Sequence, residues 1–187
     1  TDKNLRELAN FSATTANKYD SAYVYYRVIN NCNYYIAHRD TTLRTGSEQV
    51  VMKEYAAVKA IRAWAYLQLA KNYGKVPFFT EPLTQISQID GGNFPEYGIN
   101  EIVANLAPDL AQYSTLQVPG TGGTIGVGST NWGEAKKINY QNIFAPVDVV
   151  LGDLYLETGD YSNAAHYYTV YLTGNGRQGG EIYSHYV

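Results

Sequence analysis

The sequence is poor in several features on which common protein functions depend. It contains a single cysteine, Cys32, so it can form neither an internal disulfide nor a zinc site built from cysteines. Because Cys32 lies among apolar residues, we expect a buried and unreactive thiol. No run of 18 apolar residues occurs, so no segment has the length that a membrane-spanning helix needs.

An excess of basic charge is also absent. The formal net charge is −3, and the only adjacent basic pair, Lys136-Lys137, is expected in a solvated loop. A protein that binds nucleic acid generally needs a basic stripe to neutralise phosphates. We therefore expect no nucleic-acid partner.

The motifs of common enzyme classes are missing as well. His38, His166 and His185 are far apart, and no pair of them has zinc-ligand spacing. Residues 174–179 match Gly-x-Gly-x-x-Gly, but they follow a predicted helix instead of a strand, and a flexible tail is the preferred interpretation. The glycine-rich loop 120–129 lacks the Gly-Lys-Ser/Thr of a phosphate-binding loop. We expect no catalytic residue, no metal and no cofactor, and hence no enzyme.

Helical periodicity dominates what remains. Hydrophobic residues make up 45% of the 187 residues, which is enough for one domain over residues 1–187. Residues 50–72 are predicted to form a helix that ends at Gly74, with Pro77 preventing its continuation. Two apolar stripes lie on nearly opposite sides of this helix, so it should be packed between neighbours, with Trp64 in the core. The first stripe comprises Ala56, Ala60, Ala63, Leu67 and Ala70; the second comprises Val58, Ile61, Ala65 and Leu69.

The other segments are predicted to be helical too. Residues 20–40 have helical spacing with Asp20 as a cap, and residues 99–116 form a helix that Pro108 should kink or split. Strand signals are weak, since Val76 to Phe79 is too short to build a sheet. The sequence therefore predicts an all-α fold with long irregular loops.

Residues 145–172 predict two helices joined by a tight turn at Gly159-Asp160, with Pro146 in the first turn. Their spacing resembles the tetratricopeptide repeat, in which small residues let paired helices approach and aromatic rings fill the gaps. The matching positions are Leu151, Gly152, Tyr155, Gly159, Ala164, Tyr168 and Leu172. The fold expected is thus a tetratricopeptide-like helical repeat array, which is a scaffold and does not specify function.

A narrower resemblance concerns the way in which the helix over 50–72 ends. An arginine- and alanine-rich helix runs into a Tyr-Gly-x-x-Pro turn, and a short extended piece follows. This arrangement resembles the signature of the SusD/RagB family, at Arg62, Ala63, Tyr66, Leu69, Tyr73, Gly74, Val76 and Pro77. The helix over 23–40 is similar to the Tyr- and Asn-containing helix that precedes this signature in the family. The resemblance covers roughly residues 20–172.

The resemblance implies a location and partners. Members are lipid-anchored on the outer face of the outer membrane, where they bind glycans, or sometimes peptides, and pass them to a SusC-like TonB-dependent transporter. They are not enzymes. They are usually considerably longer than this chain and carry a lipidated N-terminal cysteine, a role that Cys32 cannot take inside a helix. We therefore expect a partial chain that contacts the membrane only through an anchor that it does not contain.

Glycan binding would require exposed aromatic rings with polar side chains beside them. Aromatic residues in helices are expected to be used in packing, so those in loops are the candidates, with rings packed onto the domain surface as the alternative for each. They lie in three segments, around residues 10–19, 94–97 and 131–132. The candidate ligand-binding residues are Asn10, Phe11, Asn17, Tyr19, Phe94, Tyr97, Asn131 and Trp132.

Two other functions stay open at this point. A tetratricopeptide-type scaffold could hold a peptide or protein partner without binding glycans. Alternatively, the chain could dock on the transporter without touching a ligand. Glycan-binding and transporter pull-down assays together would distinguish glycan capture, a protein-binding scaffold, and transporter docking without a ligand.

Overall fold

The computed structural model describes residues 2–10, 12, 14, 16–17, 21–46, 48–49, 51–90, 92–116, 124–127, 136–139 and 145–173. Helices dominate these residues, which confirms the all-α prediction. The helices are α1 (Lys3–Ala9), α2 (Ala22–His38), α3 (Met52–Tyr73), α4 (Ile86–Asp90), α5 (Ile99–Ala111), α6 (Val147–Glu157) and α7 (Tyr161–Thr173). Among the described residues, no helix is long and apolar enough to cross a membrane.

The strands are short and form three separate two-stranded antiparallel ribbons. They pair β1 (Arg44–Thr45) with β2 (Glu48–Gln49), β3 (Val76–Pro77) with β4 (Glu96–Tyr97), and β5 (Thr124–Val127) with β6 (Lys136–Asn139). The brevity of β3 confirms that the segment after Gly74 builds no larger sheet. Residues 124–127 and the pair Lys136-Lys137 were predicted to lie in loops, and this is wrong, since they belong to the paired strands β5 and β6.

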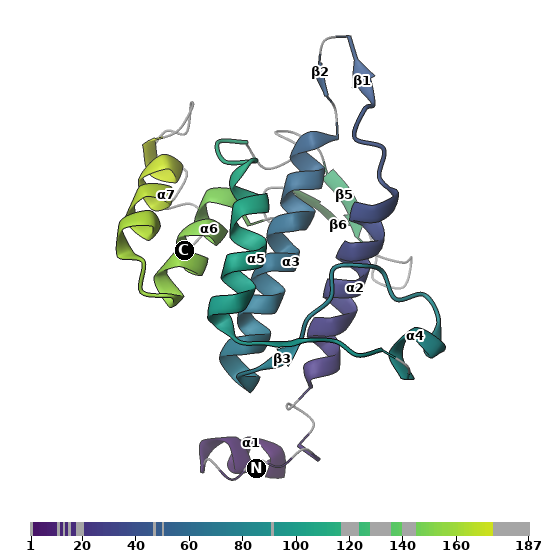
Figure 1. Cartoon of the computed structure of the whole chain (residues 1–187), viewed down its shortest axis with the longest axis vertical. Helices are drawn as coiled ribbons and strands as arrows, with labels where there is room; N and C mark the ends of the chain where they lie inside the picture. The colour runs from purple at the N-terminus through teal and green to yellow at the C-terminus, as the bar shows by residue number, and fades with distance from the viewer. Residues whose placement is uncertain are drawn as a thin grey trace.

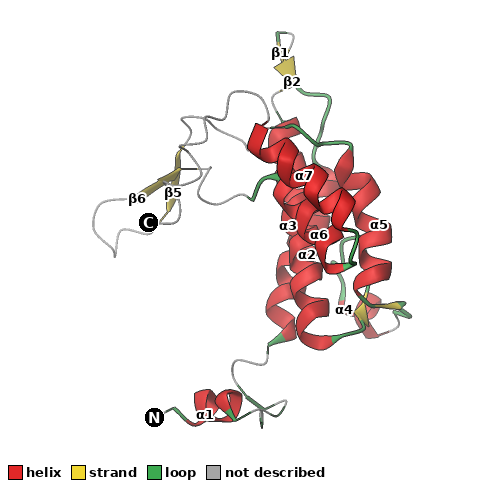
Figure 2. Ribbon diagram, turned by 90° about the vertical axis from the view of Figure 1, so that its left-hand side faces the viewer, coloured by secondary structure: helices red, strands yellow, loops and turns green. Residues whose placement is uncertain are grey.

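The five longer helices stand side by side in the order α7, α6, α5, α3, α2 (Figure 1). The ribbon β1–β2 connects α2 to α3 at one end of the array, so these two helices run antiparallel. Helix α1 lies beyond the other end, apart from the array, in both views (Figure 2). The core therefore lies between α2, α3, α5 and α6.

Helix α3 is the centre of this core because it contacts α2, α5 and α6. Every residue of its first predicted stripe is at most 2% exposed, and Ala65 and Leu69 of the second stripe are fully buried. The alanines explain the arrangement, since a side chain of one carbon lets neighbouring backbones come close. Packing of α3 on more than one side is thereby confirmed.

Trp64 departs from its prediction. It was expected in the core, but it is 42% exposed. It shares one strip of α3 with Ile61, Gln68 and Lys71, none of which is buried. Three neighbouring helices leave this strip of α3 uncovered, so its position on the helix outweighs the hydrophobicity of the indole ring.

The end of α3 follows the prediction closely. Gly74 has a φ of 78°, which is accessible to glycine at little cost, and its N–H donates to the Ala70 carbonyl at 2.8 Å. The chain then turns into β3. The Asp20 cap predicted for α2 lies outside the described residues.

Helix α5 is not divided by Pro108. It runs without interruption from Ile99 to Ala111, so of the two effects predicted for Pro108, a kink or a split, the split is wrong. Because Pro108 has no backbone N–H, the carbonyl of Ala104 lacks its usual hydrogen bond within the helix. Because Ala104 is exposed, water can satisfy that carbonyl. The helix ends before a turn that Asp148 of α6 holds by accepting a hydrogen bond from Ser114 Oγ at 2.6 Å.

Helices α6 and α7 form a hairpin around the predicted turn. Gly159 has a φ of 77°, and Asp160 Oδ1 accepts a hydrogen bond from the Asn163 N–H at 3.1 Å, so Asp160 caps α7 as predicted. Pro146 comes directly before α6 with extended backbone, one position earlier than predicted. Gly152 faces the ring of Tyr168, whose hydroxyl donates to Asp153 Oδ1 at 2.6 Å.

The close approach at Gly152 gives a direct test of this packing. A Cβ atom at position 152 would lie 2.3 Å from Tyr168 Cε1, so we expect Gly152→Ala to destabilise the fold by roughly 1–3 kcal/mol in urea unfolding. In a Tyr168→Ala background the obstacle is gone, and the same exchange should stabilise α6 by about 0.5–1 kcal/mol through helix propensity. Equal effects in both backgrounds would contradict the close packing of α6 on α7.

Candidate functional site

Side chains from α2 and α3 fasten the extended segment that follows β3. The Asn30 carboxamide pairs with the backbone of Leu83, since Nδ2 donates to the carbonyl at 2.9 Å and Oδ1 accepts from the N–H at 2.7 Å. The Tyr66 hydroxyl pairs likewise with Phe79, donating to its carbonyl at 2.7 Å and accepting from its N–H at 3.0 Å. Tyr26 Oη donates to the Pro77 carbonyl at 3.0 Å. Residues 77–83 are therefore held against α2 and α3 by side chains, and backbone pairing with residues 95–96 is confined to Pro77 and Phe78 at the start of the segment.

Asn33 joins this segment to a buried arginine. It is fully buried on α2, and its Nδ2 lies 3.3 Å from the Phe79 carbonyl and 3.4 Å from that of Glu81. Its Oδ1 accepts a hydrogen bond from Arg62 Nη1 at 3.0 Å. One carboxamide thus links α2, α3 and the extended segment.

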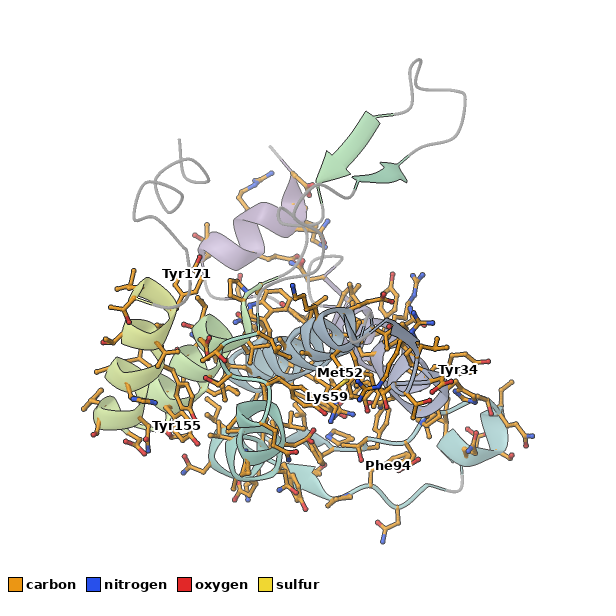
Figure 3. The ribbon with its side chains drawn as sticks, turned by 90° about the horizontal axis from the view of Figure 1, so that it is seen from above. Tyr34, Met52, Lys59, Phe94, Tyr155 and Tyr171 are labelled. Atoms are coloured by element: carbon orange, nitrogen blue, oxygen red, sulfur yellow. The ribbon has the colours of Figure 1, made fainter. Side chains whose placement is uncertain are left out.

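A second buried cation on α3 lies one turn earlier. Lys59 is 8% exposed, and its Nζ donates to both carboxylate oxygens of Asp109 on α5, at 2.8 and 2.7 Å. The rings of Tyr55 and Tyr113 flank the ammonium, with centroids 5.1 and 5.0 Å from Nζ. Lys59 lies within the layer of side chains between α3 and α5 (Figure 3). A carboxylate and two ring faces compensate the cost of burying this charge.

A hollow of about 370 Å³ opens beside these groups; we call it the Arg62 hollow. Its polar side chains come from α3, from α5 and from residues 77–83, which we call the fastened segment. Ile36, Phe78 and Leu106 supply its apolar lining. The polar lining comprises Arg62, Thr80, Glu81, Asn105 and Asp109.

Arg62 is incompletely paired within the hollow. Its side chain is 7% exposed, and Nη2 lies 3.8 Å from Asp109 Oδ2, beyond hydrogen-bond distance. Its Nε is buried and has no hydrogen-bond partner among the described residues. Burial lowers the pKa of Arg62, while the Asp109 charge opposes that shift. Arginine stays protonated in proteins, so Nε keeps its hydrogen and is a donor that has no acceptor among the described residues.

Burial also sets the protonation of two nearby groups. It raises the pKa of the Tyr66 hydroxyl well above its usual range, so this group stays neutral and can both donate and accept. It likewise raises the pKa of the Cys32 thiol to about 11. Cys32 is 7% exposed, which confirms the prediction of a buried thiol, and its high pKa disfavours the reactive thiolate.

The structure describes four of the eight predicted ligand-binding residues. Asn10 is exposed at the end of α1, whereas Asn17 is 2% exposed and its Nδ2 donates to the Asn4 carbonyl and to Glu7 Oε2, each at 3.0 Å. Asn17 is thus engaged in holding its own segment together.

The two aromatic candidates near β4 are partly used in packing. The Phe94 ring centroid lies 5.2 Å from that of Phe79, and the Tyr97 ring stacks on Phe78 at 4.8 Å. Both are half-buried. Phe94 and Tyr97 thus pack on the segment over residues 77–83, whereas Asn10 and Asn17 lie near α1, apart from that segment. Phe11, Tyr19, Asn131 and Trp132 lie outside the described residues.

Sequence reasoning did not single out the Arg62 hollow. Arg62 was named there only as part of the SusD/RagB-like signature, and neither Lys59 nor Asp109 was assigned a role. The available signal was the occurrence of two cations on a helix predicted to be packed on both sides. Such cations need buried partners, although the sequence does not say which carboxylate supplies them.

The described residues hold no group of three or more histidine, cysteine, aspartate or glutamate side chains that could bind a metal ion. No family model, no curated protein and no solved structure matches this chain.

The pairing of Lys59 with Asp109 can be tested by removing each partner. Asp109→Ala leaves a buried, unpaired ammonium and should cost about 3–5 kcal/mol of unfolding free energy, while Lys59→Met leaves a carboxylate that is 39% exposed and should cost clearly less. Urea unfolding measures both. Glu157→Ala, which breaks the more exposed pair with Lys71, is the matched control and should cost at most about 1 kcal/mol. A larger loss from Lys59→Met than from Asp109→Ala would contradict this account.

Proposed function

We propose that this chain is the repeat-bearing part of a SusD-like cell-surface protein that captures glycans without catalysis. In this proposal the full-length protein is lipid-anchored on the outer membrane and passes oligosaccharides to a SusC-like TonB-dependent transporter. The observation that carries the proposal is that residues of the SusD/RagB-like signature act together. Arg62 and Tyr66 engage Asn33 and Phe79, and Gly74 turns the chain towards them.

The chemistry of the Arg62 hollow adds support. Sugars carry many hydroxyl groups and also present apolar C–H faces, so they suit sites that combine polar side chains with apolar ones. The hollow offers both kinds of surface. The loop residues Phe11, Trp132 and their neighbours remain the aromatic candidates for stacking on sugar rings.

A tetratricopeptide-type scaffold is the second candidate function, and the α6–α7 hairpin favours it. Gly152 beneath Tyr168 and the capped turn at Gly159-Asp160 are the kind of packing expected of such a repeat. A scaffold of this kind would bind a protein partner through its helices and would not need a glycan. Saturable binding to a purified TonB-dependent transporter, with no oligosaccharide binding, would favour it.

Calorimetric titration of oligosaccharides at two salt concentrations tests the glycan proposal. We expect weak binding, micromolar to millimolar, or roughly 4–8 kcal/mol, with little salt dependence, because stacking and hydroxyl contacts neutralise no net charge. Trp132→Ala and Phe11→Ala should each weaken binding at unchanged melting temperature. Trp64→Ala, on the uncovered strip of α3, is the matched control and should bind like the parent.

Three results would count against this proposal. Steep salt dependence would indicate a charged ligand, and hydrolysis of the sugar over time would indicate an enzyme. Absence of binding across a broad set of oligosaccharides would leave the scaffold function as the better account.

A further inference from the structure

Helix α7 forms the outer edge of the helical array (Figure 1). Its principal contacts are with α6, and Ala164 is its only buried residue. A helix with so much of its surface in water usually carries charged side chains on its exposed side. None of the 13 residues of α7 is aspartate, glutamate, lysine or arginine, so its exposed side lacks the charges typical of such a helix.

Four side chains of α7 share one face, because they recur at intervals of four, three and four residues. These residues, which we call the α7 stripe, are Tyr161, Ala165, Tyr168 and Leu172. Tyr161 and Leu172, at the two ends of the stripe, are 70% and 52% exposed. Ala165 is exposed as well, and Tyr168 is half-buried against Gly152. The stripe thus has the spacing with which helices pack on one another, yet no described part of the chain covers its ends.

The α7 stripe is complementary to a second copy of itself. In an antiparallel pair of α7 helices related by a two-fold axis, Tyr161 of each copy lies opposite Leu172 of the other. Ala165 then lies opposite Tyr168, so a small side chain faces a large one. A two-fold interface needs this kind of match, because each contact occurs twice, once in each direction.

Charge favours a second copy over other occupants of the stripe. A two-fold interface brings like charges of the two copies together, and they repel unless they are balanced. Helix α7 has no such charge to repel its copy. A membrane surface is disfavoured, because helices that lie on membranes usually carry lysine or arginine on their polar face. A strongly charged protein partner would find no opposite charge on α7 to guide its approach.

We propose that the α7 stripe is the interface of a homodimer, in which two α7 helices pack antiparallel and join two helical arrays at their edges. Two helices of 13 residues form a small interface, so the dimer is weak and depends on concentration. This inference is independent of glycan binding, because α7 contributes no residue to the Arg62 hollow.

Sedimentation equilibrium at protein concentrations up to about 1 mM tests for the dimer. The parent protein should show a reversible monomer–dimer equilibrium and no larger species. Tyr161→Lys and Leu172→Glu each place an unpaired charge opposite an apolar side chain, so each should weaken the dimer about tenfold or more. Both residues are exposed, so both variants should keep the melting temperature of the parent. Ser162→Lys, which adds a charge at the next residue but off the stripe, is the matched control and should dimerise like the parent.

The double variant Tyr161→Lys/Leu172→Glu tests the antiparallel arrangement. In an antiparallel dimer, the lysine at position 161 of each copy lies opposite the glutamate at position 172 of the other, so two ion pairs form. The two positions of one copy are about 16 Å apart along the helix, which is too far for them to pair within the monomer. The double variant should therefore dimerise more tightly than either single variant. A parallel pair would place like charges together and would weaken the dimer further.

Four results would overturn this inference. A parent that stays monomeric at the highest concentration has no such dimer. Single variants that dimerise like the parent would show that the interface lies elsewhere. A double variant weaker than both single variants would exclude antiparallel pairing. Assemblies that grow beyond the dimer would indicate a contact between two different surfaces, such as the α7 stripe on the strip of α3 around Trp64, and would exclude the two-fold arrangement.

Discussion

The hydrogen bond from Arg62 to Asn33 is the contact on which the surrounding structure depends. It lies where α2, α3 and the segment after β3 meet, and it gives a buried guanidinium one of its partners. A charge in that position must be paired or the helices cannot close over it. Asn33 then uses its amide nitrogen on the carbonyls of residues 79 and 81, so the pairing of one charge also positions a stretch of loop.

The candidate site is a consequence of this arrangement. The chain after α3 leaves the helix at Gly74, forms the short ribbon β3–β4 and crosses α2 and α3 as residues 77–83. Side chains of the helices hold it there through its backbone, which leaves its own side chains available to line the hollow. Asp109 enters from α5 to pair with Lys59 and comes close to Arg62. Four parts of the chain thus meet around one cation whose donors are incompletely used.

The sequence predicts the parts of this fold that depend on local chemistry. Helical spacing located α2, α3, α6 and α7, the conformational freedom of glycine located the end of α3 at Gly74, and Asp160 was recognised as a cap. The two apolar stripes of α3 also predicted that it would be packed between neighbours. These features depend on residues within a few turns of one another.

The features that the sequence did not predict, or predicted wrongly, depend on partners distant in sequence. The burial of Lys59 follows from Asp109, which lies on another helix, and the exposure of Trp64 follows from where three neighbours leave α3 uncovered. Residues 124–127 form a strand because residues 136–139 pair with them. The Arg62 hollow could not be predicted for the same reason, since four segments create it.

Native-state hydrogen exchange tests most directly whether helix side chains hold the segment over residues 77–83. The amides of Phe79 and Leu83 lie outside any helix or strand, yet they donate to Tyr66 Oη and Asn30 Oδ1. The account predicts that both exchange as slowly as amides in the middle of α3, and that Leu83 alone becomes fast in Asn30→Ala. Exchange of both amides at the rate of an open loop in the parent protein would contradict it.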